Sequence, residues 1–312
     1  MRKLYHIDKT KSDWKEKWLE ARKKSIGASD IAGVVGLNPY KSPLWIYLDK
    51  TSQLPESDQE NIAAELGLEL ENFMRKKFVK WMKKNEDINI DVKEVPYILQ
   101  HDDIDYFTAT LDGILKHPEK GKCILEIKTT TEFKRELWQG DEVPDEYYTQ
   151  VQWQLMVTGW QWAYLVYLIG NRTFDVKLIS RNEGVIENLA NKGTGFWTQF
   201  VEKNIPPAPI GFNSDTEALK ILYPEENQES GLDLTDENEG EVIKAMEIID
   251  EQKAIEKVAR VEKTRAQQII KATIGDNEYM LAGGRKITYK TIAIAEHMVK
   301  ASQYRKLHIG KK

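Results

Sequence analysis

Two acidic residues and one lysine have the spacing that a metal-dependent hydrolytic site would require. Glu126 follows Asp112 by fourteen residues, and Lys128 follows Glu126 by two. Neighbouring carboxylates bind hard cations such as Mg²⁺, and the main-chain carbonyl of Ile127 can supply another oxygen ligand. A lysine beside such an ion can polarise a water or stabilise charge developing on a phosphate. The pattern therefore indicates phosphodiester hydrolysis.

A hairpin would bring these groups together. Segment 117–121 is rich in turn-forming residues and is centred on Glu119, from which Asp112 and Glu126 are equally distant. In an antiparallel hairpin the two carboxylates would lie opposite each other, with Lys128 on the same side as Glu126. A shift of the register by one residue would separate them. The alternative is a solvated surface triad, which arises easily by chance in a chain with 30% charged residues.

A third carboxylate is predicted on the inward side of a long helix. Gly67, Glu71, Met74 and Phe78 recur at the spacing of one helical face. A carboxylate on such an otherwise apolar face is costly unless it is paired or bound to a metal ion. Glu71 is therefore a candidate site residue, and the alternative is that it borders the apolar stripe and is solvated.

Two glutamines occupy the apolar face of a later helix that begins near Pro144. Gln150 and Gln154 share this face with Tyr147, Val151 and Thr158. Their amides are expected either to orient the lysine or an attacking water, or to bond to the main chain of a neighbouring strand.

The elements that must position these residues alternate between helix and strand. The patterns predict helices over 13–24, 26–38, 42–50, 60–85, 144–158 and 181–203, and strands over 92–99, 106–115, 122–129, 160–169 and 173–180. This order predicts a mixed α/β (α+β) core of about 210 residues, with a central sheet flanked by helices.

Composition narrows the possible sites and partners. Cys123 is the single cysteine and the five histidines are scattered, so a thiolate or imidazole metal site is disfavoured. No apolar run reaches the roughly 18 residues of a membrane span, and the amino-terminal segment lacks an apolar signal core. We therefore expect a soluble, cytoplasmic protein without a membrane partner.

The charge of the chain is unevenly distributed. Residues 213–241 contain ten acidic residues and one lysine, so the rest of the chain carries +4 although the whole carries −5. We interpret 1–212 as the main domain, 213–241 as an acidic linker and 242–312 as a separate module. In that module, a charged helix over 240–273 precedes a hairpin of 279–281 and 286–289 with a glycine turn.

Five motifs in order resemble the YqaJ-type viral recombinase family, relatives of phage lambda exonuclease among the PD-(D/E)xK nucleases. The resemblance covers about residues 14–205. The motifs are Arg22 and Ser29 within RKKSIGASDIAGVVGLNPYKSP, Gly67-x3-Glu71, LDG at 111–113, EIKT at 126–129 and YYTQVQWQLMVTG at 147–159. The resemblance implies a restriction-endonuclease-like core.

The resemblance also implies a role for each site residue. Asp112, Glu126 and the carbonyl of Ile127 would bind a first Mg²⁺, which Mn²⁺ could replace. Glu71 would assist a second metal ion. Lys128 would activate water, and Gln150 would position that water.

Arg22 and Ser29 match the residues that hold the 5′ phosphate of the digested strand in this family. Ser29 lies where a helix is predicted to begin, and its hydroxyl and the free N–H groups of that turn suit an anion. Arg22 adds a charge-assisted contact. The alternative for Ser29 is an ordinary helix N-cap.

By resemblance, the chain is expected to be a 5′→3′ exonuclease of linear double-stranded DNA that leaves 3′ overhangs for recombination. Such enzymes act as rings, with a trimer favoured here, together with a single-strand annealing protein. Two other readings remain open: a structure-specific endonuclease on the same fold, and a non-catalytic DNA- or protein-binding module. Digestion of circular DNA would favour the former, and metal-independent binding without hydrolysis would favour the latter.

Overall fold

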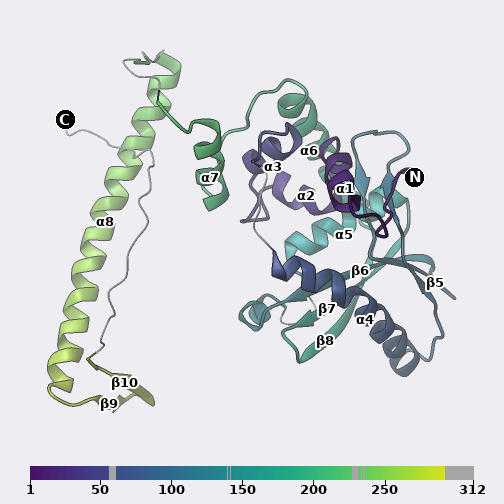
Figure 1. Ribbon diagram of the computed structural model, residues 1–312. Helices are drawn as coiled ribbons and strands as arrows, with labels where there is room; N and C mark the ends of the chain where they lie inside the picture. Colours follow the sequence, from purple (N-terminus) through teal and green to yellow (C-terminus); the bar gives the residue numbers. More distant parts are fainter. Residues whose placement is uncertain are drawn as a thin grey trace. The chain divides into compact units, whose positions relative to one another are not determined.

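The structure is a computed structural model with two compact units, Met1–Tyr223 and Pro224–Lys312. It describes residues 1–55, 61–138, 140, 142–226, 231, 232, 234 and 236–291, and only the backbone of 236–238. Unit 1 contains all of the predicted site residues (Figure 1).

A five-stranded mixed sheet forms the centre of unit 1. Its strands run in the order β2 (Val92–Lys93), β5 (Gly113–His117), β6 (Gly121–Thr130), β7 (Trp162–Ile169) and β8 (Thr173–Ser180). The β6–β7 pair is parallel and the other pairs are antiparallel. A parallel pair needs a crossover, and α5 (Asp145–Thr158) lies in the connection between β6 and β7. The predicted mixed α/β core with a central sheet is confirmed.

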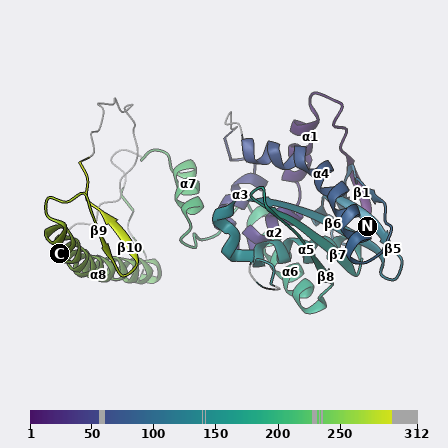
Figure 2. The ribbon, with the colours of Figure 1, turned by 90° about the horizontal axis from the view of Figure 1, so that it is seen from below.

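Helices cover both faces of this sheet (Figure 2). On one face, Met74 and Phe78 of α4 (Ile62–Asn85) are fully buried against a cluster that includes Leu125 of β6. On the other face, Ile124 of β6 packs in the cluster that contains Val151 of α5. Side chains of a strand alternate between its faces, so Glu126 and Lys128 face the same layer as Ile124. Glu71 in α4 and the two glutamines in α5 therefore approach the sheet from opposite faces.

A second sheet of three strands differs from the prediction. It consists of β1 (Arg2–His6), β3 (Tyr97–Gln100) and β4 (Thr108–Ala109). The single strands predicted over 92–99 and 106–115 are wrong, because each range divides between the two sheets. Pro96, which lacks an N–H donor, separates β2 from β3. The polar strand β1 has no apolar alternation and was not expected.

The strand β5 begins where the chain passes from one sheet to the other, at Gly113. A Cβ atom at this position would lie 2.9 Å from the Val92 side chain of β2. Glycine therefore permits the close approach of β2 and β5 directly after Asp112.

Five further α-helices are described in unit 1. Ser42 caps α3 (Pro43–Lys50) by accepting a hydrogen bond from the Trp45 N–H, and Gly159, with φ of +71°, ends α5. A π-helical turn at Trp197–Val201 continues the sixth helix. The helices are α1 (Trp14–Lys23), α2 (Ala28–Val34), α3 (Pro43–Lys50), α6 (Glu183–Phe196) and α7 (Asn213–Leu222), with a 3₁₀ segment at Glu132–Trp138.

Helix α7 lies in the range predicted as the acidic linker. It belongs to unit 1, where Ser214 accepts a hydrogen bond from the Ser42 main chain. The first ten residues of the expected linker are therefore ordered against the main domain. Residues 227–230, 233 and 235 of the linker lie outside the described residues, as do 292–312 of the predicted module.

Unit 2 contains a 39-residue helix, α8 (Asp236–Ile274), and a hairpin. Strands β9 (Tyr279–Ala282) and β10 (Arg285–Thr288) are joined by Gly283 and Gly284, whose φ angles are +55° and +72°. A two-residue turn of this kind needs positive φ at both positions, so the predicted glycine hairpin is confirmed. Within the described ranges, no helix is both long enough and apolar enough to span a membrane.

Candidate active site

The hairpin of β5 and β6 has the predicted register. Gly113 pairs with Leu125 and His117 pairs with Gly121, so the hairpin is centred on Glu119. Asp112 comes directly before the first paired residue, and its carboxylate accepts a hydrogen bond of 2.7 Å from the Ile127 N–H. The Asp112 side chain is thereby fixed at the edge of the sheet, beside Glu126.

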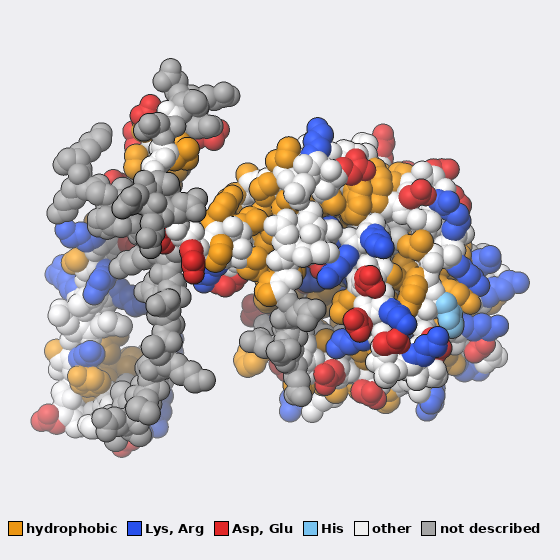
Figure 3. All heavy atoms as spheres, turned by 45° about the horizontal axis from the view of Figure 1, so that its top comes forward, with side chains coloured by type: hydrophobic (Ala, Val, Ile, Leu, Met, Phe, Trp, Pro, Cys, Tyr) orange, Lys and Arg blue, Asp and Glu red, His pale blue; other side chains and the backbone are white. Residues whose placement is uncertain are grey.

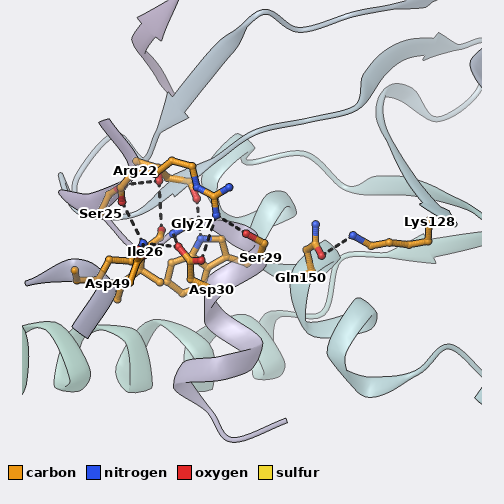
Figure 4. Close-up of polar contacts among 12 residues, drawn as sticks. Arg22, Ser25, Ile26, Gly27, Ser29, Asp30, Asp49, Lys128 and Gln150 are labelled. Atoms are coloured by element: carbon orange, nitrogen blue, oxygen red, sulfur yellow. Dashed lines mark hydrogen bonds and ion pairs between the residues drawn. The ribbon is translucent and has the colours of Figure 1, made fainter. Parts of the chain in front are cut away.

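Glu126, Lys128 and Gln150 form a closed set of contacts. The Lys128 ammonium lies 2.7 Å from the Glu126 carboxylate and donates to the Gln150 Oε1 atom at 2.8 Å (Figure 4). The Gln150 amide in turn donates to Glu126 at 2.5 Å. Because each polar end meets a partner, the three side chains hold one another in place.

Gln154 holds the second oxygen of Glu126. Its amide donates to Glu126 Oε2 at 2.6 Å and to the Thr110 carbonyl at 3.1 Å. The two uses that the sequence left open for these glutamines therefore both occur: Gln150 contacts the lysine, and Gln154 contacts both the carboxylate and a main-chain group. The buried Oε1 atom of Gln154 has no hydrogen-bond partner among the described residues.

The electrostatics of the site follow from burial of several charges together. Burial and the neighbouring Glu126 carboxylate raise the pKa of Asp112 well above its usual range. Burial would lower the pKa of Lys128, but Glu126 and Asp112 outweigh it, so the pKa of Lys128 is raised. Lys128 therefore remains an ammonium ion, which suits it to donate hydrogen bonds rather than to remove a proton.

Glu71 reaches the same region from α4. Its side chain is 17% exposed, and its carboxylate lies 3.3 Å from Arg75 and 3.9 Å from Lys9. Burial raises the pKa of Glu71 despite these two cations. Arg75 also donates to the Asp112 carbonyl at 2.7 Å, which ties α4 to the start of β5. The contacts of Arg75 and Lys9 with Glu71 were not predicted. The spacing of four residues signals the contact of Arg75, and no sequence pattern signals that of Lys9.

The carboxylate and carbonyl oxygens of this site are ligands that a divalent hard cation prefers. Among the described residues, no group of three His, Cys, Asp or Glu side chains is placed to hold a metal ion. Glu126 is buried and Asp112 is half-buried, and their mutual repulsion raises the pKa of Asp112. A hard cation relieves that repulsion, and the Ile127 carbonyl and Glu71 are oxygen donors from neighbouring elements.

Arg22 and Ser29 form a separate pair. The Arg22 guanidinium donates to the Ser29 hydroxyl at 2.5 Å and lies 4.7 Å from the centre of the Trp18 ring (Figure 4). Ser29 is the second residue of α2, and Gly27 precedes the helix. The alternative that Ser29 is an N-cap is therefore wrong. Its hydroxyl is exposed at the amino-terminal turn of α2, beside a cation, where an anion would be stabilised.

One pocket of about 390 Å³ is lined by residues of both the carboxylate–lysine site and the Arg22–Ser29 pair. Lys15 of α1 adds a further cation to its wall. On the face of unit 1 in Figure 3, basic and acidic side chains are intermingled. The residues of the predicted site that line the pocket are Arg22, Ser29, Glu71, Asp112, Glu126, Ile127, Lys128 and Gln150.

Comparison with known protein families gives a match in the same region. The YqaJ-like viral recombinase domain matches residues 17–161, a span that contains every predicted site residue. The uncharacterized protein YqaJ of Bacillus subtilis (strain 168) is 31% identical over 281 residues, which cover 89% of this chain and 84% of that protein. The uncharacterized protein R354 of Acanthamoeba polyphaga mimivirus is 33% identical over 165 residues, 46% of this chain and 26% of that protein.

Solved structures with a similar chain path include an alkaline exonuclease from Laribacter hongkongensis. It is 24% identical with a TM-score of 0.48, and the match covers 61% of this chain and 93% of that one. The same exonuclease in complex with dAMP is 22% identical with a TM-score of 0.47, at the same coverage.

Proposed function

Because this chain belongs to the YqaJ-like viral recombinase family, we propose that it is a magnesium-dependent exonuclease of linear double-stranded DNA. The observation that carries the proposal is that one pocket is lined by the Asp112 and Glu126 carboxylates, by Lys128 and by the Arg22–Ser29 pair. The carboxylates suit a hard cation, and the cations suit the phosphates of the substrate. Mn²⁺ is expected to substitute for Mg²⁺, since both prefer oxygen ligands.

Each residue around Lys128 has a different role in the proposed hydrolysis. Asp112, Glu126 and the Ile127 carbonyl would hold the first Mg²⁺, and Glu71 would assist a second. A bound Mg²⁺ neutralises phosphate charge and makes a bound water more acidic. The Lys128 ammonium donates to the attacking water or to a phosphate oxygen as negative charge develops there. Gln150 holds Lys128 and Glu126 in this arrangement and positions the water.

Arg22 and Ser29 give the enzyme its preference for an end. A terminal 5′ phosphate carries more negative charge than an internal phosphodiester, so the Arg22 cation favours it. With the 5′ phosphate bound in the same pocket as the carboxylates, the strand is cut from its 5′ end and a 3′ overhang remains. We further propose a ring-shaped oligomer, with a trimer favoured, that works in the cytoplasm with a single-strand annealing protein.

The test uses a linear, 5′-phosphorylated duplex and a closed circle of the same sequence, each with Mg²⁺ or a chelator. The linear duplex should be shortened from its 5′ ends only when Mg²⁺ is present, and the circle should stay intact. Cutting of the circle would instead identify a structure-specific endonuclease. Binding of both DNAs without hydrolysis would identify a non-catalytic module.

A further inference from the structure

A buried ion cluster lies directly behind the Arg22–Ser29 pair. The Asp30 carboxylate, in a residue only 1% exposed, lies 2.7 Å from the Lys50 ammonium and 3.2 Å from the Arg22 guanidinium. The Lys50 side chain is fully buried. These contacts join three helices, since Arg22 lies in α1, Asp30 in α2 and Lys50 at the end of α3.

The cluster contacts both the side chain and the main chain of Arg22. Asp30 contacts its guanidinium, and the Lys50 ammonium donates to its main-chain carbonyl at 3.1 Å. That carbonyl belongs to the last turn of α1 and also accepts the Ser25 N–H at 3.2 Å. The second oxygen of Asp30 also accepts the Gly27 N–H at 3.0 Å. A Cβ atom at Gly27 would lie 3.2 Å from this oxygen and 3.5 Å from the guanidinium, so glycine leaves room for the contact.

The charges of this cluster compensate one another inside unit 1. Burial would raise the pKa of Asp30, but the charges of Lys50 and Arg22 outweigh it and hold that pKa well below its usual range. The carboxylate is therefore ionised, and it meets two cations. Asp49, which is 35% exposed, also lies 3.1 Å from Lys50, so the cluster pairs two carboxylates with two cations. Of these four groups only Arg22 lines the pocket, where its guanidinium can meet a phosphate.

We infer that Asp30 and Lys50 are positioning residues that fix Arg22 for recognition of the 5′-terminal phosphate. The inference rests on the proposed function of Arg22. A free arginine side chain loses rotamer freedom when it binds an anion, and a guanidinium that is already held avoids this loss. Only the Nη2 atom of Arg22 contacts Asp30 and Ser29, so other N–H groups of the guanidinium can meet the phosphate.

The competing explanation is that Asp30 and Lys50 only hold three helices together. The two explanations predict different effects on binding of the 5′ phosphate. A structural role lowers stability and weakens all DNA ends alike, whereas a positioning role weakens phosphorylated ends more than hydroxyl ends.

The experiment measures dissociation constants for a 5′-phosphorylated and a 5′-hydroxyl duplex in Ca²⁺, which we expect to support binding without hydrolysis. Asp30→Asn alone would leave the buried Lys50 ammonium with only the partly exposed Asp49 carboxylate, so the main variant is Asp30→Asn with Lys50→Met, which removes both charges. For each protein, the affinity for the 5′-phosphorylated duplex is divided by the affinity for the 5′-hydroxyl duplex. This ratio should be about tenfold lower for the double variant than for the unmodified chain.

Asp215→Asn is the matched control. Asp215 is 3% exposed, is the third residue of α7 and accepts the Phe212 N–H, as Asp30 accepts the Gly27 N–H in α2. No described ion pair joins Asp215 to a cation. Its substitution should lower the unfolding midpoint without changing the ratio of affinities.

The outcomes separate this inference from the proposed function. If the unmodified chain shows no preference for the phosphate, the proposed 5′-phosphate pocket fails. If the unmodified chain prefers the phosphate and the folded double variant keeps the same ratio, Asp30 and Lys50 do not position Arg22. A fall in the ratio that Asp215→Asn reproduces would also overturn the inference.

Discussion

The Lys128 ammonium lies 2.7 Å from the Glu126 carboxylate, and both side chains leave β6 toward α5. The pair therefore sits between the sheet and the helix that carries Gln150. In this geometry the lysine neutralises the buried Glu126 carboxylate and still faces the pocket. A phosphate entering the pocket meets a cation that is already oriented.

Gln150 should matter more for hydrolysis than for folding. Gln150→Ala removes the hydrogen bonds to Lys128 and Glu126, and the single-turnover rate should fall about 10- to 100-fold. Gln152→Ala on the same helix is the control, because Gln152 bonds to main-chain groups at Ser180 and Asn182. It should lower the unfolding midpoint with a smaller loss of rate. Equal rate losses in the two variants would remove Gln150 from the site.

Glu71 should determine how much Mg²⁺ the enzyme requires. Glu71→Gln keeps the shape of the side chain but removes its charge, so the Mg²⁺ concentration for half-maximal hydrolysis should rise about tenfold. Glu69→Gln, an exposed glutamate two residues earlier on α4, should leave this concentration unchanged. An unchanged requirement in Glu71→Gln would show that Glu71 assists no metal ion.

Arg22 should discriminate between the two kinds of 5′ end. Arg22→Ala should slow digestion of 5′-phosphorylated duplex at least about tenfold more than digestion of 5′-hydroxyl duplex, because a charge-assisted contact is lost. The exposed neighbour Lys24 supplies the control, as Lys24→Ala alters charge without altering the pocket. Equal losses on both ends would count against a phosphate site at Arg22.

The stability contributed by Asp30 should depend on pH in one direction. The pKa of this carboxyl is held far below its usual range, so the unfolded chain takes up its proton first as the pH falls. The contribution is therefore complete above the ordinary pKa of about 3.9 and is lost below it. Thermal unfolding of the unmodified chain and of Asp30→Asn should differ by a constant amount between about pH 7 and 5, and by less below about pH 4. A difference that grows in acid would contradict this account.

The β5–β6 hairpin and the inward position of Glu71 on α4 could be predicted because each depends on a local sequence pattern. Turn residues around Glu119 set the register that places Asp112 beside Glu126, and helical spacing placed Glu71 on the buried side of α4. The family motifs added Arg22 and Ser29, which lie far from the hairpin in the sequence but line the same pocket.

The rest of the site depends on contacts between distant segments. Nothing near Lys50 in the sequence reveals that its ammonium meets Asp30, twenty residues earlier, or the carbonyl of Arg22. The division of two predicted strands between two sheets has the same origin, because the pairing of β3 with β1 depends on the amino-terminal segment. Local periodicity carries no information about such partners.

The central claim is that Asp112 and Lys128 act in Mg²⁺-dependent hydrolysis. The most direct measurement is the single-turnover rate on a linear, 5′-phosphorylated duplex for Asp112→Asn and Lys128→Met. Lys122→Met, an exposed lysine of the same strand β6, is the control, and unfolding midpoints establish that each variant is folded. Asp112→Asn and Lys128→Met should each slow hydrolysis at least about a hundredfold, while Lys122→Met keeps the rate of the unmodified chain. A folded Asp112→Asn or Lys128→Met variant that cuts at the unmodified rate would contradict the account.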